Sequence, residues 1–296
     1  MHQTQEFIMS KEQHNWDDKN LTVKHKAVKN STEGGACLNR HDGSREQNGK
    51  GAVKAVSCNH RWQGFKKALE KKATYNWPAY EALSKQKSFA MVVRARSGTR
   101  RVQAPNGENK AWDVTAGGNN FRTSCNVPFW HEAHHIVPNN VLKSCIVKVG
   151  EGKPLQVVYV KKIRSGLLKE KYNLNHKINM ILLPMDRRVA RTLQLPRHRL
   201  TSEHRSHRAY SNHVRHKLQW YLVPVQAAVQ KHEGPPANYK ACKSSIEALS
   251  KLLYDKIVAA GKLMASGKMD GDALDEIPAS HFDKVPSKSN LKGLFK

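Results

Sequence analysis

Acidic residues are scarce in this sequence, and long apolar runs are missing from it. Of 296 residues, 51 are lysine or arginine and only 24 are aspartate or glutamate, so the formal net charge is +27. No stretch of about 20 apolar residues is present to span a bilayer. The N-terminal residues do not form the charged and apolar regions of a secretory signal peptide. We therefore expect neither membrane insertion nor Sec-dependent export.

Cysteine is also sparse. The five cysteines are an odd number at wide spacings, and no Cys-x-x-Cys pair occurs among them. This spacing argues against a disulfide scaffold and against a zinc ribbon. We expect buried thiols in a reducing compartment. A bridge between Cys125 and Cys145 is an alternative if the protein crosses an oxidising space.

The remaining composition is that of a folded, soluble protein. Hydrophobic residues make up 39% of the chain and charged residues 25%, which is enough apolar material to bury a core. The lysines and arginines are spread along the sequence and are not confined to one tail. Such an excess of positive charge indicates a polyanionic partner, and nucleic acid is the first candidate.

The chain divides into three regions by composition. Residues 1–58 are polar and interrupted by glycines, which predicts an irregular or partly disordered N-terminal region that we interpret as a tail. Residues 59–234 carry the apolar patterns expected of a folded domain. Residues 235–296 predict a helical segment followed by a polar tail. The mixture of helical and strand patterns indicates an α+β fold.

Apolar periodicity predicts the individual elements. Helices are expected over residues 62–83, from residue 207 to a stop near residue 234, and over residues 239–263. Strands are expected over residues 88–95, 155–160 and 178–183.

Residues 131–138 carry the most informative motif, a pair of adjacent histidines entering a short apolar run. The first five of these residues match His-Glu-x-x-His, the zinc-protease pattern, in which both histidines lie on one turn of a helix. Pro128 and Pro138 flank the segment, and Ile136 and Val137 are β-branched, so the local sequence favours an extended conformation. We therefore do not interpret the motif as a metalloprotease site.

Interpreted as a strand, the segment resembles the HNH (ββα-metal) nucleases, and in particular their AHH branch, which is named for an Ala-His-His triplet. The resemblance continues through Asn179, which stands before an apolar run ending in Leu-Pro. It then extends through residues 204–214, which are similar to the family's His-x-x-His-x-x-Tyr-Asn helix. It covers roughly residues 120–220. It implies a ββα-metal (His-Me finger) core of the endonuclease VII superfamily, elaborated with additional helices.

The resemblance also implies the roles of the site residues. His134 would be a metal ligand and His135 the general base, since a histidine with an ordinary pKa of about 6.5 is mostly neutral at pH 7. Asn179 is expected to hold the hairpin or to orient His135, and Glu132 to form hydrogen bonds within the site. The family's helix histidines, here His204 and His207, would complete the coordination of one divalent ion, either Mg²⁺, Mn²⁺, Zn²⁺ or Ni²⁺.

Not every histidine is expected to take part. Lone histidines are more often surface or core residues than ligands. We therefore expect His198, His213 and His216 to lie outside the site.

Basic residues near these motifs are candidates for phosphate contacts. They are Lys161, Lys162, Arg164, Arg187, Arg188, Arg191, Arg197, Arg199, Arg205 and Arg208. Nothing in the sequence resembles a base-reading module, so low sequence specificity is expected.

These observations together predict a metal-dependent, largely non-specific endonuclease that cuts DNA in preference to RNA. The resemblance further implies a toxin of bacterial competition. Such a toxin would be made in the cytoplasm, delivered into a target cell by a secretion system, and restrained by an acidic immunity protein. Two alternatives stay open: a ribonuclease on the same fold, and a non-catalytic basic protein in which the histidines hold a structural zinc.

Overall fold

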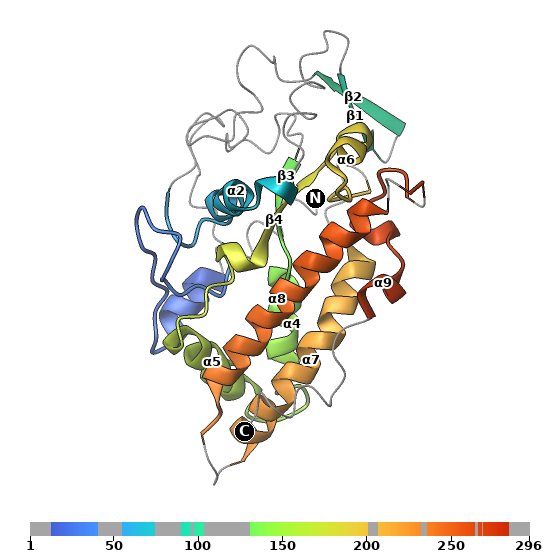
Figure 1. Ribbon diagram of the computed structural model, residues 1–296. Helices are drawn as coiled ribbons and strands as arrows, with labels where there is room; N and C mark the ends of the chain where they lie inside the picture. The colour runs from blue at the N-terminus through green and yellow to red at the C-terminus, as the bar shows by residue number, and fades with distance from the viewer. Residues whose placement is uncertain are drawn as a thin grey trace.

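The fold is mixed α+β: the described part of the chain combines helices with two antiparallel sheets of two strands each. The computed structural model describes residues 13–40, 55–74, 90–95, 98–103, 131–200, 207–231, 236–263, 266–267 and 269–283 (Figure 1). Within these residues, no helix has the length and apolar character needed to cross a membrane. The general α+β prediction is confirmed.

One sheet is a tight hairpin. Strand β1 (Ala90–Ala95) pairs antiparallel with β2 (Gly98–Gln103), and Ala95 lies opposite Gly98. The strand predicted over residues 88–95 is therefore confirmed.

The other sheet carries the histidine motif. Strand β3 (His131–His135) pairs antiparallel with β4 (Met180–Pro184), so that His134 lies opposite Ile181 and His135 opposite Met180. All five residues of β4 are buried, in agreement with its continuous apolar sequence, and the strand predicted over residues 178–183 is confirmed. The extended conformation of β3 removes the helix that the zinc-protease pattern requires.

Helix α2 (His60–Glu70) covers this second sheet. Asn59 begins the helix, because its side-chain oxygen accepts hydrogen bonds from the backbone N–H groups of Arg61 and Trp62. Gly64 permits the close approach: a Cβ atom here would lie 3.1 Å from Leu182 of β4. The helix predicted over residues 62–83 is thus present in its first part, and residues 75–83 lie outside the described part of the chain.

Three shorter helices accompany these two strands in sequence. Helices α4 (Asn139–Lys148) and α5 (Gln156–Lys169) lie between β3 and β4, and α6 (Arg187–Leu193) follows β4. The strand predicted over residues 155–160 is wrong, because these residues lead into α5. Their β-branched run favours a strand locally, but buried Tyr159, Ile163 and Leu167 recur at helical spacing and face the core. Tertiary packing overrides the local preference here.

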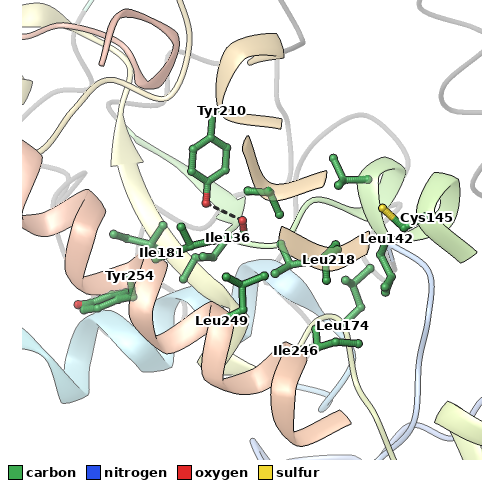
Figure 2. Packing of buried hydrophobic residues seen from close by; sticks show 14 of the residues in the cluster. Ile136, Leu142, Cys145, Leu174, Ile181, Tyr210, Leu218, Ile246, Leu249 and Tyr254 are labelled. Atoms are coloured by element: carbon green, nitrogen blue, oxygen red, sulfur yellow. Dashed lines mark hydrogen bonds between the residues drawn. The ribbon is translucent and has the colours of Figure 1, made fainter. Parts of the chain in front are cut away.

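Two long helices complete the core. Helices α7 (Arg208–Gln230) and α8 (Tyr239–Lys262) contact each other and lie side by side in Figure 1. Both predictions are confirmed. Figure 2 shows Ile181 of β4, Leu218 of α7 and Leu249 of α8 in one buried apolar cluster.

The described part of the N-terminal region is not a free tail. Residues 13–20 are helical, and the following residues are mostly irregular in conformation. Leu21, Ala36 and Leu38 are nevertheless buried in the main apolar core. Isolated β-bridges join Cys37 to Asn173 and Lys29 to Val56. The prediction of irregular structure is therefore accurate for much of this segment, but its interpretation as a tail is wrong.

The chain after α8 was also expected to be a polar tail, and for residues 269–283 this expectation is wrong. A 3₁₀ helix η6 (Leu274–Glu276) and a short helix α9 (Ala279–Asp283) fold back onto α7. Leu274 and Phe282 are buried. Four cysteines, Cys37, Cys58, Cys145 and Cys242, are buried free thiols, as expected, and Cys125 lies outside the described residues.

Candidate metal centre and the adjacent histidine

Three histidine rings converge beside the β3–β4 sheet. His134 lies near the end of β3, His198 lies in the loop after α6, and His207 immediately precedes the first turn of α7. One nitrogen from each ring lies within 4.8 Å of the other two. Because the three residues come from distant parts of the sequence, only the fold brings them together. The cluster can hold a metal ion.

The spacing and burial of these rings fit coordination. Nδ1 of His134 lies 3.1 Å from Nε2 of His198, close to the roughly 3.3 Å that separates two nitrogens bound to one zinc in tetrahedral geometry. Nε2 of His134 is buried with no hydrogen-bond partner in the described part of the chain. A buried nitrogen without a partner costs about 1–3 kcal/mol. Only one nitrogen of this ring can bind the ion: Nδ1 has the matching separation from His198, whereas binding through Nε2 would offset the cost of its burial.

Glu132 orients His198. Its carboxylate accepts a 2.7 Å hydrogen bond from Nδ1 of His198 and a bidentate interaction from the guanidinium of Arg199. Since a carboxylate only accepts, Nδ1 of His198 carries the proton and its Nε2 presents a lone pair to the cluster. A carboxylate behind a histidine is the usual support of a metal ligand. Glu132 therefore acts through His198.

Helix α7 fixes the third ring. Nδ1 of His207 lies 3.1 Å from the hydroxyl of Ser211, one turn further along the helix. Tyr210 packs against the rings of both His134 and His207, and its hydroxyl donates a 2.6 Å hydrogen bond to the carbonyl of Ile136 (Figure 2). The start of α7 is thereby attached to the residue that follows His135.

The electrostatics of the cluster favour neutral rings. Burial lowers the pKa of His134 well below its ordinary value, and the neighbouring histidines lower it further. Burial also lowers the pKa of His198, and that of His207 to about 3. Glu132 is also buried, which opposes ionisation, yet Arg199 and His198 hold the pKa of its carboxyl far below the usual range. Neutral imidazoles beside an ionised carboxylate are the protonation states that a metal ion requires.

His135 faces a different environment from its neighbour. Its Nε2 lies 2.8 Å from the side-chain oxygen of Asn175, and its ring stacks on that of His60 at 5.2 Å. The amide nitrogen of Asn175 donates to the carbonyl of Asn39, which turns its oxygen toward His135. Nε2 of His135 therefore carries the proton, and Nδ1 has no hydrogen-bond partner among the described residues. Burial lowers the pKa of His135 to about 4, so the ring is neutral at pH 7.

Asn179 holds the end of the β3–β4 sheet. Its side-chain oxygen accepts from the backbone N–H of Val137, and its amide nitrogen donates to the carbonyls of Val137 and Leu174. Ser250 of α8 donates a further hydrogen bond to the same oxygen. The hairpin-holding role expected for Asn179 matches this geometry, whereas Asn175 is the residue that contacts His135.

A buried polar network supports Asn175 from the N-terminal side. Arg164 of α5 forms an ion pair with Asp17, with Nη2 and Oδ2 2.5 Å apart. Both residues bond to the side chain of Asn39, whose backbone carbonyl accepts from Asn175. A continuous chain of hydrogen bonds thus runs from Arg164 to His135.

Most of the basic residues predicted to contact phosphate have partners inside the protein. Arg164 is buried with Asp17, Arg197 is buried against the C-terminal residues, and Arg199 binds Glu132. Arg187 and Arg191 pair with Asp270, and Arg188 pairs with Asp186. The lysines lie on α5, where Lys162 is exposed and Lys161 partly buried, and Arg208 is exposed at the start of α7.

The predicted site residues fall into three groups. Glu132, His134, His135, Asn179 and His207 lie together around the sheet. His204 and Arg205 lie outside the described residues. His198 was expected to lie outside the site, but it belongs to the cluster, whereas the exposed His216 lies further along α7.

Two site residues, His198 and Asn175, were missed by sequence reasoning, because neither stands in a pattern that indicates a site. His198 stands between two arginines in a loop without periodicity, and Glu132, the residue that identifies it as a ligand, is distant in sequence. Asn175 belongs to an Asn-Leu-Asn triplet just before β4, a pattern that reads as a turn.

Comparison with known proteins finds no similarity that assigns the chain: no protein-family model matches it, and neither a curated protein nor a solved structure matches it significantly.

Proposed function

We propose that this protein is a metal-dependent endonuclease of the HNH (ββα-metal) type that hydrolyses phosphodiester bonds of DNA with little sequence preference. In this proposal, β3, β4 and the first turns of α7 form the ββα-metal core. The roles are divided among the residues described above. His134, His198 and His207 hold the ion, and His135 is the general base.

The observation that carries the proposal is the placement of His134 and His135. They are consecutive residues at the end of one strand, yet one ring joins the three-histidine cluster and the other does not. A purely structural metal site has no need for the second ring. His135 is neutral and has its Nδ1 lone pair unused among the described residues, so it can accept a proton from a water molecule next to the cluster. Asn175 holds the ring in the required tautomer.

The donor set restricts the identity of the ion. Three imidazole nitrogens suit Zn²⁺, Ni²⁺ and similar transition metals, whereas Mg²⁺ prefers oxygen ligands. A bound ion would supply Lewis-acid stabilisation of charge on the phosphate and on the departing oxygen. With these three imidazoles as its protein ligands, a tetrahedral ion would keep one position for substrate, as in catalytic zinc sites.

Charge supports nucleic acid as the substrate. The net charge of +27 favours binding to any polyanion, and exposed Arg208 directly follows the ligand His207. Lys162 of α5 is a second exposed cation. The sequence predicts no base-reading module, which agrees with cleavage at many different DNA sequences. In the biological setting that the resemblance implies, the enzyme is a toxin delivered between bacteria and inhibited by an acidic immunity protein.

Nicking of supercoiled plasmid tests the proposal. Purified protein is incubated with Mg²⁺, Mn²⁺, Ni²⁺ or Zn²⁺, with and without EDTA, and compared with the His135→Ala and His216→Ala variants. We expect nicking that EDTA abolishes and that falls by about 10²- to 10⁴-fold in His135→Ala, while metal binding is retained. His216 is an exposed histidine on α7, and its replacement should leave nicking unchanged.

Other outcomes separate the alternatives. Cleavage of RNA but not of plasmid would identify a ribonuclease that uses the same site. Stoichiometric metal binding without cleavage of either substrate would favour the zinc-stabilised nucleic-acid-binding protein, in which the ion has a structural role only.

A further inference from the structure

The C-terminal segment, residues 269–283, contacts the loop that carries His198. Ala273 forms a parallel β-bridge with Arg197, the residue directly before this ligand. The backbone N–H of Arg197 donates to the carbonyl of Asp272, and that of Leu274 donates to the carbonyl of Arg197. Both the N–H and the carbonyl of Arg197 are therefore bonded to the segment, which fixes the backbone of the loop that carries His198.

The side chain of Arg197 strengthens this attachment. Only 4% of Arg197 is exposed. Its guanidinium donates to the carbonyl of Gly271 and to the carboxylate of Glu276 in the C-terminal segment, and to the carbonyls of Arg199 and Leu200 in its own loop. A buried guanidinium with its donors directed to fixed acceptors is a rigid link. It joins the segment to the residues on either side of His198.

The same segment also contacts the start of α7, where the third ligand, His207, lies. His207 occupies the N-cap position of α7, but its side chain makes no capping hydrogen bond. Asp275, which is distant in sequence, caps the helix instead: its carboxylate accepts hydrogen bonds from the backbone N–H groups of Arg208 and Tyr210. A carboxylate here satisfies two of the free N–H groups of the first turn and interacts favourably with the helix dipole.

Helix α9 fixes the segment to the core independently of these contacts. Phe282 packs against the rings of Tyr210 and His213. The side chain of His281 lies 2.8 Å from the carbonyl of Lys256 of α8. The segment therefore has its own anchor on α7 and α8, and it contacts two of the three ligand-bearing elements from there.

We propose that the C-terminal segment sets the separation between His198 and His207. Asp275 of the segment and Arg197 of the loop that carries His198 are the positioning residues. Docking of the segment and binding of the ion are then coupled: each strengthens the other by the same factor. The inference rests on the metal centre of the proposed function, but not on hydrolysis. According to this inference, residues outside the histidine motif help to determine metal affinity.

Metal affinity of the protein tests this inference. Zn²⁺ affinity is measured by competition with a chromophoric chelator for the wild type, Asp275→Ala, Asp275→Asn and Asp270→Ala, and Co²⁺ absorption spectra report the coordination geometry. We expect Asp275→Ala to weaken Zn²⁺ binding by about 10- to 100-fold, the usual effect of removing a residue that supports a ligand. Asn can still accept a hydrogen bond from α7, so Asp275→Asn should restore most of the affinity.

Asp270→Ala is the matched control. Asp270 lies in the same segment and is also acidic, but it pairs with Arg187 and Arg191 on α6 and not with a ligand-bearing residue. Its variant should bind Zn²⁺ as the wild type does. If Asp275→Ala folds and binds Zn²⁺ with unchanged affinity and an unchanged Co²⁺ spectrum, the inference is wrong.

Hydrogen exchange of the wild type provides a second test that needs no substitution. Addition of Zn²⁺ should slow exchange of the amides of Leu274 and Arg208, whose acceptors lie across the contact between the segment and the ligand-bearing residues. Unchanged exchange at these amides would contradict the coupling even if Asp275→Ala failed to fold. Failure of the wild type to bind any ion would instead refute the metal centre itself. Failure to cleave DNA leaves both tests valid.

Discussion

Two segments from opposite ends of the chain support the two halves of the candidate site by different means. The N-terminal segment, residues 13–40, reaches His135 through Asn39 and Asn175. The C-terminal segment reaches the ligands through Arg197 and Asp275. The first rests on a buried ion pair between side chains, whereas the second uses backbone hydrogen bonds and a helix cap.

Because the two halves have different supports, weakening each support should affect a different property of the site. The hydrogen bonds that run from Asp17 through Asn39 and Asn175 lead to the proposed base, so weakening them should reduce catalysis more than metal binding. The C-terminal contacts lead to His198 and His207, so weakening them should reduce metal binding first. Cleavage and metal affinity, measured on the same variants, distinguish the two halves.

The largest expected effect comes from the buried ion pair of the N-terminal segment. Asp17 and Arg164 are 4% and 1% exposed. Asp17→Ala leaves the guanidinium of Arg164 buried without its counter-charge, and should lower the free energy of unfolding by about 3–5 kcal/mol. Urea denaturation measures the change.

Asp18→Ala is the matched control for this prediction, because Asp18 is the exposed neighbour of Asp17. Its substitution should change the free energy of unfolding by less than about 0.5 kcal/mol. Equal denaturation midpoints for the two variants would show that the ion pair does not stabilise the N-terminal segment.

The sequence carried much of the information about the metal half and little about its supports. The His134–His135 pair, the buried strand after Asn179 and the amphipathic helix after His207 each have a local pattern, and all lie around one site in the structure. His198 has no such pattern, since its role depends on a carboxylate that only the β3–β4 pairing brings near. Local patterns predict elements, but they do not predict which loop meets which strand.

The same limit explains the errors about the two ends of the chain. Both ends are polar and poor in apolar periodicity, which is typical of tails. Asp17 and Asp275 are nevertheless structural, because each satisfies a group on a distant helix: the guanidinium of Arg164 and the first N–H groups of α7. A polar side chain whose partner is remote in sequence leaves no local signal.

The second prediction concerns Asn175, the contact between the N-terminal segment and His135. Asn175→Ala removes the acceptor of the Nε2 proton, and the ring is then free to adopt the other tautomer and to rotate. We expect plasmid cleavage to fall by about 10- to 100-fold, as for loss of other supporting residues, with unchanged Zn²⁺ affinity. A parallel loss of Zn²⁺ affinity would contradict the division of the site into two halves.

Asn173→Ala serves as the comparison for this variant. Asn173 belongs to the same triplet and is also buried. Its amide nitrogen donates to the carbonyl of Ser57 and its side-chain oxygen accepts from the backbone N–H of Asn175, so its side chain supports the turn, whereas the side chain of Asn175 contacts His135. Both variants should lose comparable stability in urea, whereas only Asn175→Ala should show the larger loss of cleavage per folded molecule.

Tyr210 joins the two halves, and its hydroxyl offers a smaller perturbation. Tyr210→Phe keeps the ring against His134 and His207 but removes the hydrogen bond to the carbonyl of Ile136. The free energy of unfolding should fall by about 1–2 kcal/mol, since a buried acceptor loses its donor. Because Tyr210 contacts two ligand rings and the residue that follows His135, cleavage and Zn²⁺ affinity should fall together and modestly. An effect on only one of them would show that the hydroxyl supports that half alone.

The smallest expected effect is the pH dependence of metal binding, and its sign follows from the lowered pKa values. Protons compete with the ion for the same nitrogens. A ligand histidine with an ordinary pKa of about 6.5 would lose roughly tenfold in neutral population between pH 7.5 and pH 5.5. Burial lowers the pKa of His207 to about 3 and that of His134 well below its ordinary value, so these two rings stay neutral throughout this range. Burial lowers the pKa of His198 in the same direction. Zn²⁺ affinity measured by competition at these two pH values should therefore be nearly the same. A loss approaching tenfold for each ligand would mean that the rings are open to water when no ion is bound, and that the ion itself assembles the buried cluster.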